Sequence, residues 1–214
     1  MVLISGSGTN LQALIDDLAG QPGAASIVGV ISNKADAYGL QRAAAAGIQT
    51  RTLNHLDFTD REAFDQALQQ TIDAFAPDLV LLAGFMRILT AGFAKHYRGR
   101  LLNIHPSLLP KHKGLHTHQR ALDEGDPEHG ATVHFVTEEL DGGPLILQGR
   151  IKIIPGDDAT SLAIQVQQLE YRLFPVVTRW FAAARLQLNE DRACLDGSPI
   201  PPSGLRLEDL ESGI

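Results

Sequence analysis

Short apolar runs alternate with amphipathic segments along the first half of the chain. The apolar runs, each of a length that suits a buried strand, lie at residues 2–4, 27–31 and 78–83, and residues 48–53 predict a further strand. The amphipathic segments, with apolar residues every three or four positions, lie at residues 11–18, 38–46 and 60–75. Strands that alternate with helices predict an α/β fold with a Rossmann-like, mostly parallel sheet and helices on both faces. A capping-box sequence from Thr59 to Glu62 predicts where the third helix begins.

The stretch from Leu101 to Pro110 begins as a fifth strand and ends in a polar turn. Side chains alternate between the two faces of a strand, so Asn103 and His105 are expected on the same face. Pro106 cannot donate to a sheet ladder and disfavours a helical residue before it, so the strand should end at His105. Open α/β sheets bind ligands at this carboxyl edge, so this turn is a candidate site.

The pattern changes in the second half of the chain. Residues 119–124 predict a short helix, and residues 132–136 and 145–154 predict two strands. These strands should pair antiparallel, because no helix-length crossover separates them. An apolar stripe along residues 162–180 predicts a long helix that packs on the sheet and bends at Pro175.

The two ends of the chain carry smaller features. Residues 186–202 predict a hairpin that turns at Asp196-Gly197, and the last ten residues look dispensable. The first strand is short for a buried one, which suggests a natural start upstream of Met1. A length of 214 residues favours a single domain.

Composition narrows the classes of function. A net charge of −7 and a pI near 5.5 argue against nucleic-acid binding, which depends largely on basic residues. No apolar run approaches the ~20 residues that span a bilayer, and no signal peptide is evident, so we expect a cytoplasmic protein without a membrane partner. The single cysteine, Cys194, excludes an internal disulfide and fits a reducing compartment.

A glycine-containing turn follows the first strand. Its sequence, Ser5 to Asn10, contains Gly6 and Gly8 and leads directly into a helical pattern. The amino terminus of a helix presents free N–H groups and suits a phosphate. Leu11 stands where a dinucleotide fingerprint needs a third small residue, and the P-loop sequence is absent. The turn is therefore either a cradle for one phosphate or only a tight turn.

Six of the eight histidines lie between His105 and His134, which raises the question of a metal site. His112 and His116 are four residues apart, as in a zincin helix. Pro110 and Gly114 disfavour a helix there, and no glutamate follows His112, so we expect no metal. His105 is either a satisfied structural histidine or a catalytic group.

A catalytic role for His105 fits the residues around it. Asn103 shares its face of the strand, and Asp141 lies in a glycine-rich loop that can bring a carboxylate close. An amide and an imidazolium can stabilise an oxyanion, while a carboxylate orients the imidazole or relays a proton. Ser107 lacks the partner geometry of a nucleophile, so we expect direct transfer between two bound substrates.

Five runs of sequence together resemble phosphoribosylglycinamide formyltransferase. They are Ser5 to Leu11, Gly84 to Leu89, Leu102 to Pro110, Gly114 to His118 and Leu140 to Pro144. The resemblance extends over nearly the whole chain. It implies the formyltransferase fold and the transfer of a formyl group from 10-formyltetrahydrofolate, the co-substrate, to the amine of glycinamide ribonucleotide in purine synthesis.

The resemblance also implies roles for individual residues. Asn103, His105 and Asp141 would be catalytic. The residues that would bind the ribonucleotide are Gly8, Thr9 and Asn10 at its phosphate, with Gln167 and Glu170. The residues that would bind the folate are Arg61, Met86, Arg87, Ile88, Leu89 and Asn103. From the helical pattern alone, Gln167 and Glu170 would be a solvated face, and Arg61 an ordinary first-turn residue.

The same resemblance implies an organisation for the chain. Residues 1–214 would form one formyltransferase domain, with a nucleotide-binding half at 1–100 and a catalytic and folate-binding half at 101–214. Its partners would be small-molecule substrates, and we expect a monomer or a weak homodimer.

Other functions remain as alternatives. A formyltetrahydrofolate hydrolase would use the same three residues with water as acceptor, although such relatives usually carry an extra amino-terminal domain. A non-catalytic folate or nucleotide binding module would bind without turnover. A methionyl-tRNA formyltransferase is disfavoured by the acidic composition, and a nicotinamide dehydrogenase by Leu11.

Overall fold

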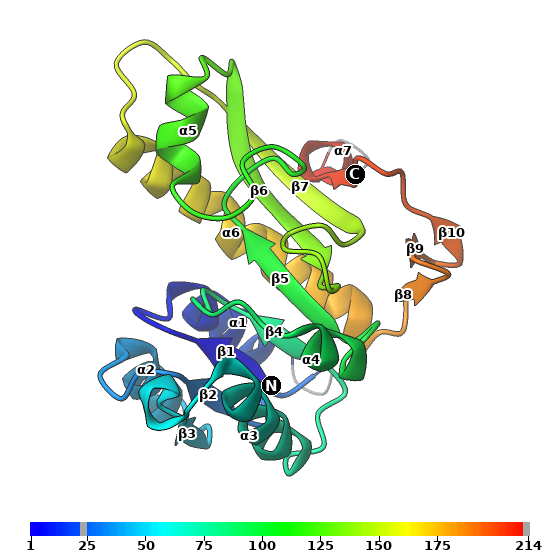
Figure 1. The fold of residues 1–214 in the computed structure, drawn as a ribbon. Helices are drawn as coiled ribbons and strands as arrows, with labels where there is room; N and C mark the ends of the chain where they lie inside the picture. The colour runs from blue at the N-terminus through cyan, green and yellow to red at the C-terminus, as the bar shows by residue number, and fades with distance from the viewer. Residues whose placement is uncertain (22–24, 212–214) are drawn as a thin grey trace. The chain divides into compact units, whose positions relative to one another are not determined.

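The computed structural model describes residues 1–21 and 25–211. The chain divides into two compact units, Met1–Asn103 (unit 1) and Ile104–Ile214 (unit 2), and the division falls within one strand (Figure 1). The expected fold class is confirmed. The chain is α/β, with a mostly parallel sheet flanked by helices and with antiparallel strands in its carboxy-terminal part.

Unit 1 contains a parallel sheet in the order β5-β4-β1-β2-β3. Its strands are β1 (Val2–Ile4), β2 (Val30–Ser32), β3 (Thr50–Thr52), β4 (Val80–Leu82) and β5 (Leu101–His105). The central strands β1, β2 and β4 are fully buried. Parallel strands covered on both faces need apolar side chains on both, which explains the continuous apolar runs in the sequence.

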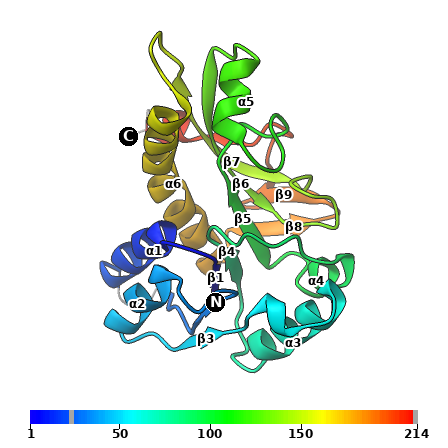
Figure 2. The same cartoon turned by 60° about the vertical axis from the view of Figure 1, so that its left-hand side comes forward.

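The helices of unit 1 cover both faces of this sheet. In Figures 1 and 2, α1 (Thr9–Ala19) and α2 (Tyr38–Ala45) lie on one face, and α3 (Arg61–Asp73) and α4 (Ala91–His96) on the other. A short 3-10 helix, η1 (His55–Asp57), precedes α3. The amino-terminal cap of α3 is Asp60, whose carboxylate accepts from the Ala63 N–H at 2.8 Å, so the expected cap at Thr59 was one residue early. The pattern analysis did not predict α4, which is only six residues long.

Unit 2 is built around two antiparallel strands and a long helix. The strands β6 (Glu128–Phe135) and β7 (Leu145–Lys152) pair antiparallel, as predicted. The helix α6 (Ala159–Ala182) packs against both strands, contains Pro175, and begins with a capping box between Asp158 and Ser161. The short helix α5 (Thr117–Asp123) packs on α6 and β6.

The carboxy-terminal part differs from the prediction in two ways. The expected hairpin is a three-stranded antiparallel sheet of β8 (Leu186–Asn189), β9 (Arg192–Leu195) and β10 (Ser198–Pro199). The last ten residues are not simply dispensable, because β11 (Leu205–Arg206) pairs with β7 and the first residue of α7 (Leu207–Glu211) is buried. Residues 212–214 of that segment lie outside the described residues.

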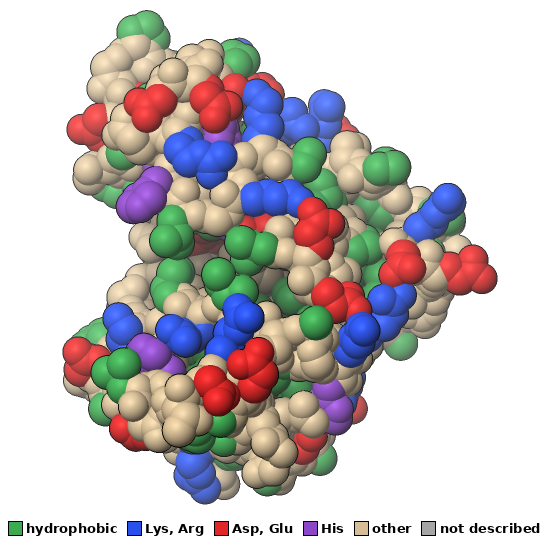
Figure 3. Space-filling model, in the orientation of Figure 1, with side chains coloured by type: hydrophobic (Ala, Val, Ile, Leu, Met, Phe, Trp, Pro, Cys, Tyr) green, Lys and Arg blue, Asp and Glu red, His purple; other side chains and the backbone are tan. Residues whose placement is uncertain are grey.

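The surface mixes both signs of charge. On the face drawn in Figure 3, acidic and basic side chains are interspersed. Among residues 1–21 and 25–211, no helix has both the length and the hydropathy needed to cross a membrane.

Candidate active site

The strand β5 positions the first two candidate catalytic residues. It ends at His105, as the following proline predicts. Asn103 and His105 occupy alternate positions of the strand; Asn103 is half-buried and His105 is 6% exposed. An imidazole with so little contact with water needs partners in the protein for both ring nitrogens.

The ring of His105 has a partner on each side. Its Nδ1 lies 3.5 Å from Oδ2 of Asp141, the third candidate catalytic residue. Its Nε2 donates to the backbone carbonyl of His112 at 2.9 Å. Asp141 lies in the left-handed region with φ 48° and accepts the Gly114 N–H at 2.9 Å. Unit 2 therefore brings His105 and Asp141 together, as the sequence predicted.

A second histidine, which the sequence analysis did not assign, lies on the other side of Asp141. His134 Nε2 is 3.8 Å from Asp141 Oδ1, and its Nδ1 donates to the Phe135 carbonyl at 2.9 Å. Burial lowers the pKa of His134, so it remains neutral at neutral pH. Asp141 is thus a buried carboxylate between two imidazoles, an arrangement that can orient the ring of His105.

The loop that follows β5 (residues 106–116, the β5 loop) is held by buried polar side chains. Ser107 Oγ donates to the Lys111 carbonyl at 2.7 Å, which agrees with its exclusion as a nucleophile. Thr132 Oγ1 donates to the Ser107 carbonyl at 2.6 Å, and Gln148 Nε2 donates to the Leu109 carbonyl at 2.8 Å. Thr132 and Gln148 were missed, although polar residues within apolar strands are a usable signal for such roles.

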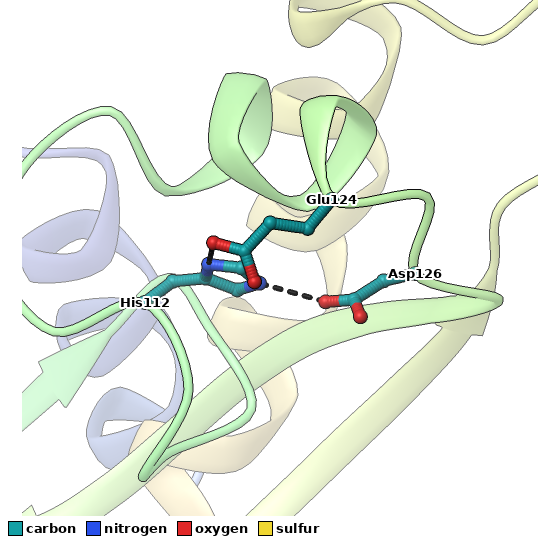
Figure 4. Close-up of side chains that lie close together, drawn as sticks. All are labelled: His112, Glu124 and Asp126. Atoms are coloured by element: carbon teal, nitrogen blue, oxygen red, sulfur yellow. Dashed lines mark hydrogen bonds and ion pairs between the residues drawn. The ribbon is translucent and has the colours of Figure 1, made fainter.

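His112 in the β5 loop, together with Glu124 and Asp126 after α5, provides the donor atoms of a metal site. One ligand atom from each of His112, Glu124 and Asp126 lies within 4.8 Å of the others (Figure 4). Both oxygens of the Asp126 carboxylate already have protein partners. His112 Nε2 donates to Oδ2 at 2.7 Å, and the Lys111 ammonium pairs with the other oxygen. Exposed His116 is not part of this cluster, and α5 begins only at Thr117, so the zincin-like pair does not form.

Hydrogen bonds determine the charge state of Asp126. Burial alone would raise its pKa, but hydrogen bonds from Lys111 and His112 outweigh burial and lower the pKa below its usual value. Asp126 is therefore an ionised acceptor at neutral pH.

A neighbouring pair of histidines is neutral. His118 Nδ1 and His129 Nε2 lie 3.0 Å apart. The pKa of His129 is lowered to about 4, mainly by burial and then by the charges of His118 and His112. Burial also lowers the pKa of His118. One neutral ring can donate to the other, and this pair contributes buried polar structure beside the β5 loop.

The glycine turn between β1 and α1 (residues 5–8, the β1 turn) lies in unit 1. Gly8 has φ 69° and precedes the first residue of α1. A Cβ on Gly8 would lie 2.5 Å from Gly39 Cα, so the close approach of α2 requires glycine. The Gly39 N–H donates to Gly6 O at 3.0 Å, and Arg42 Nε donates to Ser7 O at 2.9 Å. The sequence analysis missed Gly39 and Arg42.

The first two residues of α1 were also candidates for phosphate binding. Thr9 is half-buried and Asn10 is buried, which leaves the backbone at the start of α1 as the part suited to an anion. The structure thus forms the strand, turn and helix that the sequence predicted.

The segment Gly84 to Leu89 is fixed at both ends within unit 1. The Met86 N–H donates to Ser5 Oγ at 2.7 Å, which joins this segment to the β1 turn. The Thr90 N–H donates to the carboxylate of buried Asp65 at 2.6 Å. The side chains of Met86 and Ile88 between these ends are 64% and 56% exposed.

Arg61 is the first residue of α3, Arg87 lies near Phe64 of the same helix, and Leu89 is half-buried. The Arg87 guanidinium lies 5.9 Å from the centre of the Phe64 ring. Burial raises the pKa of Asp65, and Arg61 counteracts this through its charge. Asp65, which the sequence analysis missed, is therefore part of the same group of residues.

Gln167 and Glu170 lie on α6 in unit 2. Gln167 is half-buried and Glu170 is only 9% exposed, so the pattern-based expectation of a solvated face was wrong for Glu170. A largely buried glutamate on a helix that is otherwise apolar on that side is a candidate for a role in binding.

Comparisons with known proteins identify the family of the chain. A family model described as formyl transferase matches residues 1–178. The chain is 54% identical to phosphoribosylglycinamide formyltransferase of Escherichia coli, over 95% of this chain and 96% of that protein. It is 46% identical to the trifunctional purine biosynthetic protein adenosine-3 of Bos taurus, over 90% of this chain and 19% of that protein.

A solved structure gives the same result. The phosphoribosylglycinamide formyltransferase of Coxiella burnetii superposes with a TM-score of 0.90 at 52% identity, covering 96% of each chain. Matches of this extent, in sequence and in structure, show that the chain belongs to the formyl transferase family.

Proposed function

We propose that this enzyme transfers a formyl group from 10-formyltetrahydrofolate to the amine of glycinamide ribonucleotide, a step of de novo purine biosynthesis. The observation that carries the proposal is the buried His105–Asp141 pair at the end of β5, with Nδ1 and Oδ2 3.5 Å apart. The similarity to phosphoribosylglycinamide formyltransferases supports the choice of donor and acceptor.

The chemistry requires a group that stabilises negative charge on the formyl oxygen. The substrate amine attacks the formyl carbon directly, and the oxygen becomes an oxyanion. Asn103 donates a hydrogen bond to this oxyanion, and the His105 imidazole beside it helps to stabilise it, with Asp141 assisting. The proton lost by the amine leaves through water to the nitrogen that departs from the formyl carbon, so protons balance over the transfer.

Asp141 assists His105 in this proposal. Its buried carboxylate lies beside Nδ1 of His105, and it accepts the Gly114 N–H, which fixes its orientation. A neutral His134 on its other oxygen adds no second positive charge that would compete for the carboxylate.

Two groups of residues are assigned to the ribonucleotide by the family resemblance. Gly8, Thr9 and Asn10 at the start of α1 would hold the phosphate with backbone N–H groups. Gln167 and Glu170 on α6 would bind polar groups of the substrate; the similarity to phosphoribosylglycinamide formyltransferases supports this assignment.

The folate would be bound by the segment from Met86 to Leu89 with Arg61 and Arg87. Met86 and Ile88 leave apolar side chains exposed, which suits a flat aromatic ligand, and the tethered backbone of the segment offers hydrogen-bonding groups. The two arginines would pair with the carboxylates of the folate glutamate. Asn103 would contact the folate at the formyl group.

The test is turnover of a 10-formyl folate analogue with and without glycinamide ribonucleotide. We expect turnover only with the ribonucleotide, and its loss in His105→Ala. Turnover in buffer alone would indicate formyltetrahydrofolate hydrolysis instead. Binding of both ligands without any turnover would indicate a non-catalytic binding module.

We infer that the enzyme works in the cytoplasm as a monomer or a weak homodimer and acts on small molecules without a metal. The placement in purine biosynthesis follows the name of the Bos taurus relative. Analytical ultracentrifugation over a range of concentrations tests the oligomeric state.

A further inference from the structure

The imidazole of His105 is oriented by a backbone group of the β5 loop. Its Nε2 lies 2.9 Å from the carbonyl oxygen of His112. A carbonyl only accepts hydrogen bonds, so Nε2 must carry a proton. The other nitrogen, Nδ1, is then the one that faces Asp141. The partner of one ring nitrogen thus determines which nitrogen is free to gain or lose a proton.

The carbonyl of His112 depends on a backbone conformation that a side chain must support. His112 has φ 54°, in the left-handed region that residues with a Cβ rarely adopt. Its side chain is 1% exposed and donates through Nε2 to Asp126 at 2.7 Å. Lys111 pairs with the other oxygen of Asp126. The imidazole of His112 is therefore anchored to Asp126, while the backbone carbonyl of the same residue bonds to His105.

We propose that His112 is a positioning residue for catalysis: Asp126 anchors its side chain, and the anchored residue holds its own carbonyl against His105 Nε2. The proton of His105 is thereby kept on Nε2, and Nδ1 is presented to Asp141. The proposal rests on the proposed function, because it assumes that His105 is catalytic. It adds His112 and Asp126, which contribute to the reaction only through His105.

A divalent metal held by His112, Glu124 and Asp126 is the competing explanation of the same cluster. The two explanations differ in their need for Glu124. If Asp126 anchors His112, Glu124 is not needed, because its Oε1 lies 3.6 Å from His112 Nδ1 and its side chain is 57% exposed. A metal would use Glu124 as one of three ligands.

The kinetic test compares two disruptive variants with a matched control. His112→Phe keeps a ring but removes the bond to Asp126, and Asp126→Asn keeps the size of the acceptor but removes its charge. We expect each to lower kcat by about 10- to 10²-fold through misplacement of His105, with KM for both substrates changed by less than ~3-fold. Glu124→Gln removes the carboxylate that makes no hydrogen bond to His112 and should retain wild-type kcat.

The spectroscopic test reads the tautomer directly. Nitrogen-15 NMR of the histidine rings, assigned with His105→Ala, should show His105 protonated at Nε2 in the wild type and in Glu124→Gln. In His112→Phe and Asp126→Asn the Nε2 and Nδ1 signals should move toward a mixture of tautomers. Asp126→Asn keeps this test decisive if His112→Phe fails to fold.

The outcomes separate the explanations. Unchanged His105 ring signals, or unchanged kcat, in folded His112→Phe or Asp126→Asn would overturn the proposal. Stoichiometric zinc that Glu124→Gln releases, with activity lost on chelation, would overturn it in favour of a metal site. If the wild type shows no formyl transfer, the proposed function fails, whereas the ring signals still decide whether His112 sets the tautomer.

Discussion

The β5 loop in unit 2 and the β1 turn in unit 1 both follow a parallel strand, but they are held in different ways. The β5 loop is fixed by side chains, with Thr132 and Gln148 bonded to its carbonyls and Asp126 bonded to His112. The β1 turn depends instead on close backbone packing, since the Gly39 N–H donates to it and Gly8 and Gly39 are in close contact, and Arg42 Nε adds a side-chain bond to the Ser7 carbonyl.

This difference matches the chemistry proposed for each region. A catalytic imidazole needs a defined proton position, which specific polar partners provide. A phosphate cradle needs converging N–H groups and free space, which small residues and a helix terminus provide. Substitutions in the β5 loop should therefore act mainly on kcat, and those in the β1 turn mainly on substrate binding and stability.

The largest expected effect is a loss of activity on substitution of the three proposed catalytic residues. Asn103→Ala, His105→Ala and Asp141→Ala should each reduce kcat by at least ~10²- to 10³-fold, because loss of one preorganised donor costs about 2.7 to 4 kcal/mol. Steady-state kinetics with both substrates, alongside circular dichroism to confirm folding, measures this. Near-wild-type turnover in any variant would remove that residue from the mechanism.

The second expected effect tests the backbone-held turn. A Cβ on Gly8 would clash with Gly39 Cα, and its φ of 69° disfavours a side chain. Gly8→Ala should therefore lower the free energy of unfolding by about 1 to 2 kcal/mol from conformation and about 1 to 3 kcal/mol from the clash. The KM for the ribonucleotide should rise by more than kcat falls.

Gly6→Ala is the matched control in the same turn. A Cβ on Gly6 has no atom within 4 Å, and Gly6 is exposed. Stability should remain close to that of the wild type. Equal losses of stability in Gly6→Ala and Gly8→Ala, measured by urea unfolding, would show that the close contact with α2 is not what requires glycine.

The same contrast explains how far the sequence could predict the structure. The end of β5 was predictable because Pro106 acts locally on the residue before it. The antiparallel pairing of β6 and β7 was predictable because their connection is too short for a crossover. The residues Asn103, His105 and Asp141 could be proposed as a catalytic group because amide, imidazole and carboxylate groups have recognisable chemistry.

The missed residues act through contacts that are distant in sequence. Thr132 lies 25 residues from the carbonyl that it holds, and Gln148 lies 39 residues from its partner. Gly39 looks like an ordinary helix residue until Gly8 is placed against it. The terminal strand β11 is two residues long and has no local pattern; its pairing with β7 defines it. These roles arise from tertiary packing, which periodicity does not contain.

The third prediction concerns the neutral histidines beside the β5 loop. The pKa of His129 is lowered to about 4, whereas its value in an unfolded chain is about 6.5. The unfolded state therefore binds more protons between these values, and the free energy of unfolding should fall as pH decreases from about 6.5 toward about 4. His129 contributes at most about 1.4 kcal/mol per pH unit to the slope of the free energy of unfolding against pH.

His129→Gln should flatten this dependence, because an amide does not titrate yet can still bond to His118. Urea unfolding at several pH values measures the slope, and His116→Gln, at an exposed position, serves as control. An unchanged slope in His129→Gln would show that other groups cause the acid sensitivity of the protein.

The smallest expected effect is at Asp65, a buried titratable group of unit 1 whose pH dependence has the opposite sign. Its pKa is raised, mainly by burial, so the folded state binds a proton more readily than the unfolded state. The stability that protonated Asp65 contributes is present below its unfolded pKa and is lost as pH rises through its folded pKa.

Asp65→Asn removes the buried charge and keeps an oxygen that accepts the Thr90 N–H. Removal of the buried charge should stabilise the fold, and the weaker hydrogen bond to Thr90 should destabilise it by a similar amount. Stability at pH 7 should therefore change by less than about 1.5 kcal/mol. Stability of the variant relative to the wild type should fall as pH is lowered, since the wild type alone gains from protonation. A variant that is less stable at pH 7 and more stable than the wild type at low pH would mean that Asp65 acts mainly as a charged anchor for Thr90, as Asp126 does for His112.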